Sequence, residues 1–381
     1  MTNQILSSTR IFNATKTHEE YKNTPIFCGP EPGLMDTIHK PFPKLWDLYK
    51  ELKSNDWDEQ EFDHTRCNLD FKNAHEDISY FMINNIFWQW QSDSVAGRSI
   101  LSIMDPFVSS TEYWTCLTRI ADNENIHGAT YSEIVRMSFD NPHKVISDCL
   151  QNQDALKRLS IVERTLSEAD KLSSQYAAGL IKMSDELYRD VCIKTTIILL
   201  FLERLQFMAS FAVTFTICST GLFQSIGTAV QKICQDELEI HAEFDKEVLN
   251  YEMKTEKGKS VINSLKDWIS DLCDEVIQAE FDFIDYLYKD NRSVPGLSAD
   301  ILRQWVLFNA KDIVKFLNID TGDKYKFPKQ NPMPHIEAWF DVSKRQIALQ
   351  ESDAVAYKVG IVRDDAEDLI VTGKQIGRAH V

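Results

Sequence analysis

Apolar positions along the chain recur with the spacing of helices rather than strands. The run YFMINNIFWQWQSDS, within residues 73–97, is too long and too continuously apolar for a typical strand. A second helix is expected after residues 109–112 (SSTE), which resemble a capping box, and should end near Phe139. Further helices are predicted at about residues 154–180, 185–219, 225–254, 259–289 and 298–317. The pattern predicts an all-α protein.

Turn signals and helices together divide the chain into three regions. Residues 1–60 contain several Gly and Pro turn signals and predict an irregular arm with a short helix near Leu45–Leu52. Residues 61–330 carry the long helices and form the main domain. Residues 331–381 form a C-terminal segment, whose tail is expected to be flexible beyond Gln350.

One stretch, residues 205–231, contains no charged residue and is long enough to raise the question of a membrane span. Polar residues such as Gln206, Ser210 and Thr214 interrupt it. We therefore expect a buried core helix and no membrane association.

Charge and cysteine usage narrow the class of protein further. The chain has 381 residues and a formal net charge of −17, which disfavours binding to nucleic acid because that binding relies on Lys and Arg. Its eight cysteines form no Cys-x-x-Cys pair, so neither a zinc knuckle nor a disulfide framework is indicated. The N-terminus lacks the pattern of a signal peptide. These features predict a protein of the reducing cytoplasm.

Candidate chemistry begins in the helix after residue 110. Glu124, His127 and Tyr131 lie at positions i, i+3 and i+7, which places them on one helix face. A single Glu-x-x-His is common by chance and usually marks a solvated face. Other segments decide whether this one is functional.

Two later segments repeat the same ligand types. Glu237 and His241 follow Ile233 at i+4 and i+8 in one stripe, since four residues turn an α-helix by ~400°. Glu203 stands in the apolar run IILLFLERLQFMASF, with Phe207 and Phe211 following on its side. A salt bridge to the adjacent Arg204 is the alternative reading, but that residue points ~100° away on the helix. An unpaired buried carboxylate is prohibitively costly, and a metal ion would compensate its charge.

Asp93, near the end of the first apolar helix, supplies a fourth acid. Four segments thus offer four carboxylates and two imidazoles, the inventory of di-iron and di-manganese carboxylate bundles of the ferritin-like type. Four negative charges would balance two divalent cations. Oxygen and imidazole ligands suit iron or manganese, and the sequence does not choose between them. The expected ligands are Asp93, Glu124, His127, Glu203, Glu237 and His241.

The order and context of these residues resemble the class I ribonucleotide reductase small subunit from about Trp57 onward. SDSVAGR (92–98) resembles the family's Asp-Ser-x-x-Gly-Arg, and ENIHGATY (124–131) its Glu-x-x-His-x-x-x-Tyr, whose tyrosine carries the radical. LERLQFMASF (202–211) and ICQDELEIH (233–241) stand where the third and fourth ligand segments belong. The resemblance implies a ferritin-like dimetal bundle with additional helices.

The resemblance also implies roles for residues around the metals. Phe207, Phe211 and Ile233 would form the apolar pocket of a radical on Tyr131. Trp57, as the family's near-surface tryptophan, and Asp236 would link His127 to the exterior. NPMPHIEAW (331–339) resembles the family's segment before the tail. In that tail, Tyr357 and Glu351 would relay the radical to the large subunit.

Two features depart from the family pattern. The usual Asp-Glu-x-x-His is replaced here by Asp236-Glu237 with His241 one residue later. Glu239 is the rival ligand, but it lies ~200° around an ideal helix from Glu237, and a local π-bulge could alter that phase. The last residues, IVTGKQIGRAHV, lack the acidic and apolar finish of the family, which puts their origin and their docking role in doubt.

By resemblance, the chain is an oxidoreductase subunit whose two metal ions, most simply iron, activate dioxygen to oxidise Tyr131. Mixed manganese–iron and dimanganese centres stay open. The implied partners are a large subunit that reduces ribonucleotides and a second copy of the chain. Two alternatives are a di-iron oxygenase or desaturase, which needs a hydrocarbon-sized pocket, and a ferritin-like metal-storage protein.

Overall fold

The structure, a computed structural model, describes residues 11–340 and shows an all-helical protein. Within these residues the only β-type pairings are two isolated bridges, Phe27 with Val108 and Val294 with Leu297. The predicted all-α class is confirmed. The helices are α1 (His18–Asn23), α2 (Pro43–Ser54), α3 (Cys67–Asn73), α4 (Glu76–Met104), α5 (Thr111–Ser138), α6 (Pro142–Gln151), α7 (Gln153–Ala177), α8 (Asp185–Tyr188), α9 (Lys194–Phe201), α10 (Phe207–Cys218), α11 (Gln224–Asp236), α12 (Ala242–Glu252), α13 (Glu256–Ser264), α14 (Lys266–Leu287), α15 (Ala299–Leu317) and α16 (Glu337–Phe340).

Five-residue π turns interrupt the two central helical rods. The turns are η2 (Arg189–Ile193) and η3 (Leu202–Gln206), which join α8, α9 and α10, and η4 (Glu237–His241), which joins α11 and α12. Such turns close with i to i+5 hydrogen bonds, as from the Ala242 N–H to the Glu237 carbonyl. They shift the helical phase within a rod that stays continuous.

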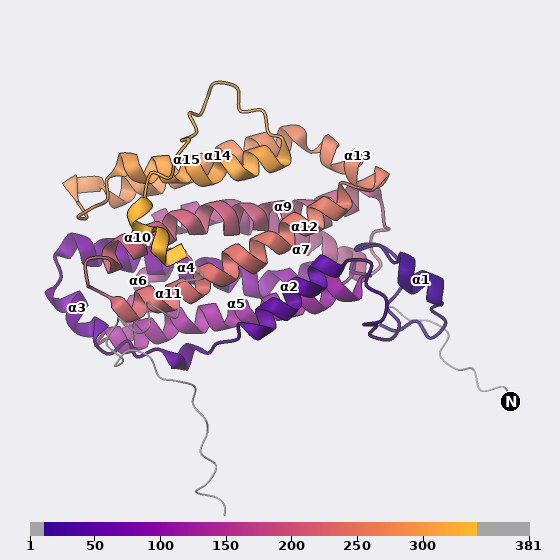
Figure 1. The fold of residues 1–381 in the computed structure, drawn as a ribbon, viewed down its shortest axis with the longest axis horizontal. Coiled ribbons are helices and arrows are strands. Elements are labelled where there is room, and N and C mark those ends of the chain that lie inside the picture. Colours follow the sequence, from indigo (N-terminus) through magenta and orange to yellow (C-terminus); the bar gives the residue numbers. More distant parts are fainter. Residues whose placement is uncertain (1–10, 341–381) are drawn as a thin grey trace, which may run out of the picture.

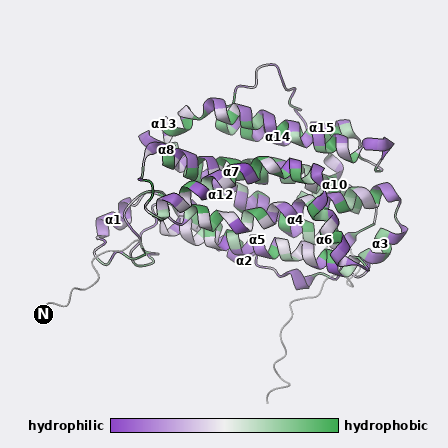
Figure 2. Cartoon of the chain, turned by 180° about the vertical axis from the view of Figure 1, so that it is seen from behind, coloured by the Kyte–Doolittle hydropathy of each residue, from purple (hydrophilic) through white to green (hydrophobic). Residues whose placement is uncertain are grey.

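The long helices run side by side along the longest axis of the molecule (Figure 1). α4 packs against α5, α7 and α10, and α12 packs against α9. Outside this layer, α14 and α15 pack on α7 and α10, and α2 lies along α5. Figure 2 shows hydrophobic and hydrophilic residues mixed along α14, α5 and α2, as expected of amphipathic helices.

The uncharged stretch, residues 205–231, falls on two helices, because α10 ends at Cys218 and α11 begins at Gln224. Residues Asp185–Cys218 are long and apolar enough to cross a membrane, but 94% of their most apolar window is buried inside the protein. Within this span, Arg204 donates to Asp312 of α15 at 2.8 Å. The alternative ion pair between Glu203 and Arg204 is therefore not formed.

Some helix boundaries differ from those predicted. α4 continues beyond Gly97 to Met104. Gly97 does not end the helix; it gives α5 room to pack closely, since a Cβ here would lie 3.1 Å from the Cβ of Glu124. The helix predicted over residues 259–289 is interrupted at Leu265. The short helices α1, α3 and α6 were not predicted, since each is too short for a clear periodic signal.

The predicted capping box before α5 takes another form. Ser110 is the N-cap, and its hydroxyl accepts from the Tyr113 N–H at 3.1 Å. Glu112 accepts from the Phe42 N–H at 3.1 Å and from the Ser110 hydroxyl at 2.9 Å. Glu112 therefore ties the N-terminal region to α5 instead of closing a box on its own helix.

Candidate metal centre

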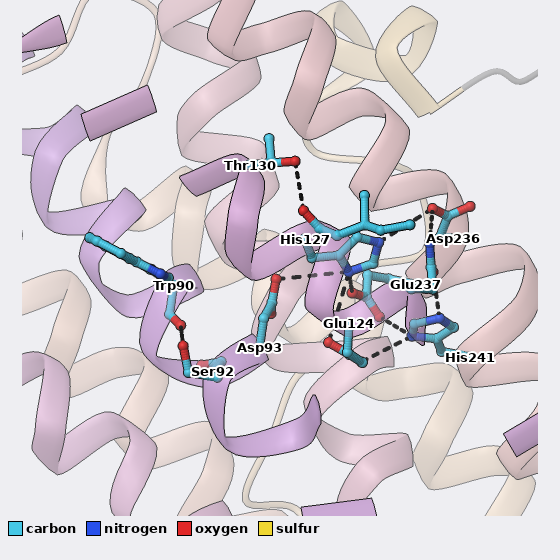
Figure 3. Close-up of polar contacts among 12 residues, drawn as sticks. Trp90, Ser92, Asp93, Glu124, His127, Thr130, Asp236, Glu237 and His241 are labelled. Atoms are coloured by element: carbon cyan, nitrogen blue, oxygen red, sulfur yellow. Dashed lines mark hydrogen bonds and ion pairs between the residues drawn. The ribbon is translucent and has the colours of Figure 1, made fainter. Parts of the chain in front are cut away.

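Four helical segments deliver acidic and imidazole side chains to one buried point between them. Figure 3 shows Asp93, Glu124, His127, Glu237 and His241 converging there. α4 and α5 lie on one side, and the two rods with the π turns η3 and η4 on the other. Two groups of four residues form there, in each of which the possible ligand atoms lie within 4.8 Å of one another. The groups are Asp93, Glu124, His127 and Glu237, and Glu124, Glu203, Glu237 and His241.

The two groups share Glu124 and Glu237, so they form two adjacent candidate cation sites. His127 Nδ1 lies 2.9 Å from Glu237 Oε1 and 3.8 Å from both Asp93 Oδ2 and Glu124 Oε2. His241 Nδ1 lies 2.8 Å from Glu237 Oε2 and 3.2 Å from Glu124 Oε1. Both Nδ1 atoms and both Glu237 oxygens lack the geometry of a hydrogen bond to any described partner. These atoms converge on common points, as ligands do.

Burial and the neighbouring charges shift the pKa of each of the four carboxyl groups. Burial, and then Glu124, raises the pKa of Asp93 well above its ordinary value. Burial and Glu237 likewise raise the pKa of Glu203. For Glu237, burial alone would raise the pKa, but His241 and His127 outweigh it and lower the pKa. Protons thus neutralise the site in the absence of cations, and two divalent cations would replace them.

A second layer of polar groups holds the imidazoles in orientation. Asp236 Oδ2 lies 3.3 Å from His127 Nε2 and accepts from Trp57 Nε1 at 2.7 Å. The Asn123 amide donates to the same Asp236 oxygen at 3.1 Å, and its carbonyl oxygen lies 2.9 Å from His241 Nε2. Asn123 therefore contacts His241 directly and is linked to His127 through Asp236.

Tyr131 lies one helical turn beyond His127 on α5 and is fully buried. Its hydroxyl has no hydrogen-bond partner among the described residues. Burial raises the pKa of Tyr131 far above its usual range, and Asp93, Glu237 and Glu124 raise it further. The phenol is therefore neutral and close enough to the carboxylates to be influenced by their charge.

Comparison with known proteins decides the family. The family "Ribonucleotide reductase, small chain" matches residues 37–332. The chain belongs to the ribonucleotide reductase small-chain family. As a member, it is the small, or beta, subunit of a class I ribonucleotide reductase.

Relatives of this ribonucleotide reductase subunit span nearly its whole length. It is 24% identical to the ribonucleoside-diphosphate reductase 1 subunit beta of Escherichia coli O157:H7, over 93% of this chain and 97% of the relative. It is 23% identical to the small chain of Schizosaccharomyces pombe, over 82% and 72%. Among solved structures, the R2 subunit from Clostridium botulinum matches with a TM-score of 0.70 at 14% identity, over 87% and 98%. Dimanganese(II)-NrdF of Streptococcus sanguinis matches with a TM-score of 0.61 at 14% identity, over 78% and 96%. These structures share the all-helical fold of this chain.

The remaining predicted site residues of the reductase subunit are placed as follows. Phe207, Phe211 and Ile233 are fully buried in the same core cluster as Tyr131. Trp57 is 5% exposed, and its ring packs edge-on against Phe62, which follows η1 (Glu59–Glu61). Its burial was missed because the charged sequence NDWDEQEFD has the composition of a solvated loop.

The rival ligand Glu239 lies outside the cluster, and two predicted tail residues fall beyond the described part of the chain. Glu239 belongs to neither ligand group and lines a small surface pocket with Gln235 and Trp339. Glu237, inside the π turn η4, occupies the cluster instead. Tyr357 and Glu351 lie outside the described residues.

Asn123 is the residue that sequence reasoning missed. It stands four residues before His127, so a search one turn back from each imidazole would have found it. No motif requires an amide there, and its second contact, with His241, depends on how α5 packs against η4.

Proposed function

We propose that the chain generates and holds a radical on Tyr131 and passes it to the large subunit, which reduces ribonucleotides. The observation that carries the proposal is the pair of ligand groups sharing Glu124 and Glu237, one helical turn from a buried phenol. Residues 61–330 would be the catalytic domain, residues 1–60 an N-terminal arm, and residues 331–381 the segment that docks the large subunit.

Two metal ions fit the cluster, because four carboxylates and two imidazoles converge there with unsatisfied ligand atoms. When bound, the two ions would supply the electrons that reduce dioxygen and would then accept one electron from Tyr131. Iron is the proposed metal, and the donor set equally accepts a mixed manganese–iron or a dimanganese pair. The proposed ligands are Asp93, Glu124, His127, Glu203, Glu237 and His241.

The surroundings of Tyr131 support a joint loss of its electron and proton. Because its pKa is raised far above the usual range, the phenol keeps its proton until an electron leaves, so electron and proton depart together. The hydroxyl makes no hydrogen bond among the described residues, and burial excludes water. Phe207, Phe211 and Ile233 would form the apolar pocket that keeps reductants away from the radical.

Radical transfer would begin at the contacts behind His127. Trp57 donates its N–H to Asp236, so the indole has a carboxylate ready to accept its proton when it loses an electron. The route would continue through Tyr357 and Glu351 into the large subunit. The proposed working form is a cytoplasmic homodimer that binds dioxygen and neither nucleic acid nor a membrane.

The test combines metal analysis with electron paramagnetic resonance. Metal-free protein is loaded with ferrous iron and exposed to dioxygen; two irons per chain and a tyrosyl radical signal are expected. The signal should vanish in Tyr131→Phe and persist in Tyr113→Phe, a control for another buried tyrosine of α5. A tyrosyl signal that survives in Tyr131→Phe would refute the assignment of the radical.

The alternative functions lack support in the described residues. A cavity beside Glu124, Glu203 and His241 measures about 20 Å³, enough for a single water and far below the several hundred Å³ of organic ligand sites. A hydrocarbon oxygenase is therefore disfavoured. Metal storage would require many irons per chain, which the same metal analysis measures.

A further inference from the structure

We infer that Arg158 protects the indole of Trp88 from oxidation, so that the metal centre draws its electron from Tyr131. The inference rests on the proposed function, since it concerns which side chain gives an electron to the metal centre. Trp88 stands five residues before Asp93 on α4, or ~7.5 Å of helix rise at 1.5 Å per residue. Its ring lies 5.1 Å from that of Phe207, which follows Glu203 by four residues on the opposite rod.

A buried cation covers the face of this indole. The guanidinium carbon of Arg158 lies 3.6 Å from the Trp88 ring centroid and 4.6 Å from that of Phe283. Trp88 is fully buried, and Arg158 is 2% exposed. A guanidinium keeps its charge at every pH that proteins tolerate, so the charge nearest the ring is positive.

Four hydrogen bonds hold the cation in this position. Nε and Nη2 of Arg158 donate to the two carboxylate oxygens of Glu280 at 2.6 and 2.7 Å. Nη2 also donates to the Gln206 carbonyl at 2.8 Å, and Nη1 to the Ser210 hydroxyl at 3.3 Å. Burial raises the pKa of Glu280 while Arg158 opposes that rise, and the bidentate geometry favours the ion pair. The carboxylate binds the edge of the guanidinium, whereas the indole meets its face.

The second protecting feature is the absence of a proton acceptor. Trp88 Nε1 has no hydrogen-bond partner among the residues that the structure describes. Oxidation of Trp88 would send one electron to the metal centre in place of the electron from Tyr131, and the resulting indole radical cation would retain its proton. That cation would face the positive charge of Arg158, so both the cation–π attraction and the electrostatics oppose its formation.

Trp57 has the opposite surroundings at the same centre. Its N–H donates to Asp236 at 2.7 Å, and its ring stacks on His127 at 5.8 Å. A carboxylate both stabilises an oxidised indole and accepts its proton. Trp88 Nε1 has no such acceptor among the described residues. Two buried indoles, one stacked on His127 and one packed on Phe207, thus have opposite partners.

The decisive variants separate the charge from the packing. Arg158→Gln alone would leave Glu280 buried without its partner and risk unfolding. The double variant Arg158→Gln/Glu280→Gln removes the cation and its counter-ion together. Glu280→Gln alone removes the ion pair but keeps the cation over Trp88. Arg164→Gln breaks the exposed Arg164–Glu275 pair between the same two helices, α7 and α14, and serves as the matched control.

Each protein is loaded with ferrous iron, exposed to dioxygen, and measured by electron paramagnetic resonance and by tandem mass spectrometry of the Trp88 peptide. In the double variant the Trp88 radical cation no longer faces a guanidinium, and it loses its N–H proton to water that enters the space left by the shorter glutamine. The neutral radical adds dioxygen to form a peroxyl radical, which takes one electron from the added ferrous iron and one proton from water. The product is a hydroperoxide, detected as tryptophan that carries two added oxygen atoms. We expect the double variant to contain about tenfold more oxidised Trp88 than the wild type, with a lower yield of tyrosyl radical. Glu280→Gln and Arg164→Gln should match the wild type in both. Adding Trp88→Phe to the double variant should restore the tyrosyl yield.

Three outcomes would overturn the inference. They are unmodified Trp88 in the double variant, as much oxidised Trp88 in Glu280→Gln as in the double variant, and a low tyrosyl yield that Trp88→Phe does not restore. The last would mean that Arg158 acts through packing near Gln206. A wild-type protein that forms no tyrosyl radical would refute the proposed function instead, so the two failures are distinguishable. Circular dichroism of the metal-free variants verifies that each is folded.

Discussion

Asn123 shows how a neutral side chain can organise a charged site. Its amide nitrogen donates to Asp236 and its oxygen lies 2.9 Å from His241 Nε2, so one residue orients groups behind both imidazoles. Contacts of this kind fix the tautomer and direction of metal-binding histidines. With the Asn123 oxygen accepting the Nε2 proton, Nδ1 is the His241 atom that faces the carboxylates and is left to bind a cation.

Replacing Asn123 with leucine, which has a similar size and no polar atoms, should weaken metal binding by about 10- to 100-fold. Competition with a coloured chelator measures the affinity. Asn125→Leu is the control, because Asn125 bonds only the Ala121 carbonyl of its own helix. Equal affinities of the Asn123 variant and the wild type would contradict the role given to this residue.

Metal binding should depend on pH in a defined direction. In the metal-free protein, burial lowers the pKa of His241, but Glu237 outweighs burial and raises the pKa to about 10. His241 is therefore protonated at pH 7 and must lose its proton to bind a cation, so affinity should fall as pH falls below about 10. Calorimetry in buffers of different ionisation enthalpy measures this release. Uptake of protons on binding would contradict it.

Protonated His241 also links pH to the stability of the metal-free fold. Its folded pKa lies above the unfolded value, so its contribution is complete below the unfolded pKa of about 6.5 and is lost as pH rises through about 10. Thermal unfolding of the metal-free protein between pH 6 and 10 measures this loss. Metal-loaded protein, whose imidazoles carry no proton at Nδ1, should lack this component.

At the residue scale, spacing predicted the cluster and missed its surroundings. Glu124 and His127 could be found because i, i+3 spacing defines a helix face without any tertiary information. Asn123, the burial of Trp57 and the cation over Trp88 depend on which helices meet. Packing partners are absent from a local pattern.

At the element scale, the π turns explain an unusual spacing. The four-residue interval from Glu237 to His241 coincides with η4, whose i to i+5 bond accommodates one more residue than an α-turn. Glu203 lies in a second such turn, η3. The sequence suggested a π-bulge in ICQDELEIH because its spacing departs from the family pattern, whereas LERLQFMASF carries no comparable signal.

Gly97 sets the approach of α4 to α5. A Cβ there would lie 3.1 Å from the Cβ of Glu124, so Gly97→Val should push the two helices apart and destabilise the protein by about 1–3 kcal/mol. Metal affinity should fall as well, because Glu124 belongs to both ligand groups. Urea unfolding and chelator competition measure the two effects.

Gly128 provides the matched control on α5. Nothing lies within 4 Å of a Cβ at Gly128, so Gly128→Ala should leave metal binding unchanged and raise stability by up to about 1 kcal/mol through helix propensity. If Gly97→Val were as stable as the wild type and bound metal equally well, close approach at Gly97 would not matter.

At the scale of the whole molecule, the bundle supports a buried charged site by surrounding it with rigid rods. The same sequence periodicity that predicted the helices also predicted the all-α class, because long amphipathic helices have few other ways to bury their faces. The short helix predicted near Leu45–Leu52 is present as α2. Its packing against α5, with Leu45 and Leu52 buried, was not predicted, because the flanking Gly and Pro turns gave no sign of which helix it meets.

The tail carries a separate functional prediction. Tyr357→Phe should retain the Tyr131 radical and abolish ribonucleotide reduction with the large subunit, because phenylalanine cannot lose a proton and an electron as tyrosine does. Radical content by electron paramagnetic resonance and deoxyribonucleotide formation measure the two steps independently. Full reductase activity in this variant would remove Tyr357 from the proposed route.

The most direct test of the account is anomalous X-ray diffraction from crystals of the iron-loaded protein. Two adjacent anomalous peaks are expected between α4, α5, η3 and η4, each within bonding distance of Glu124 and Glu237. A single peak, peaks elsewhere in the bundle, or coordination by Glu239 in place of Glu237 would contradict it.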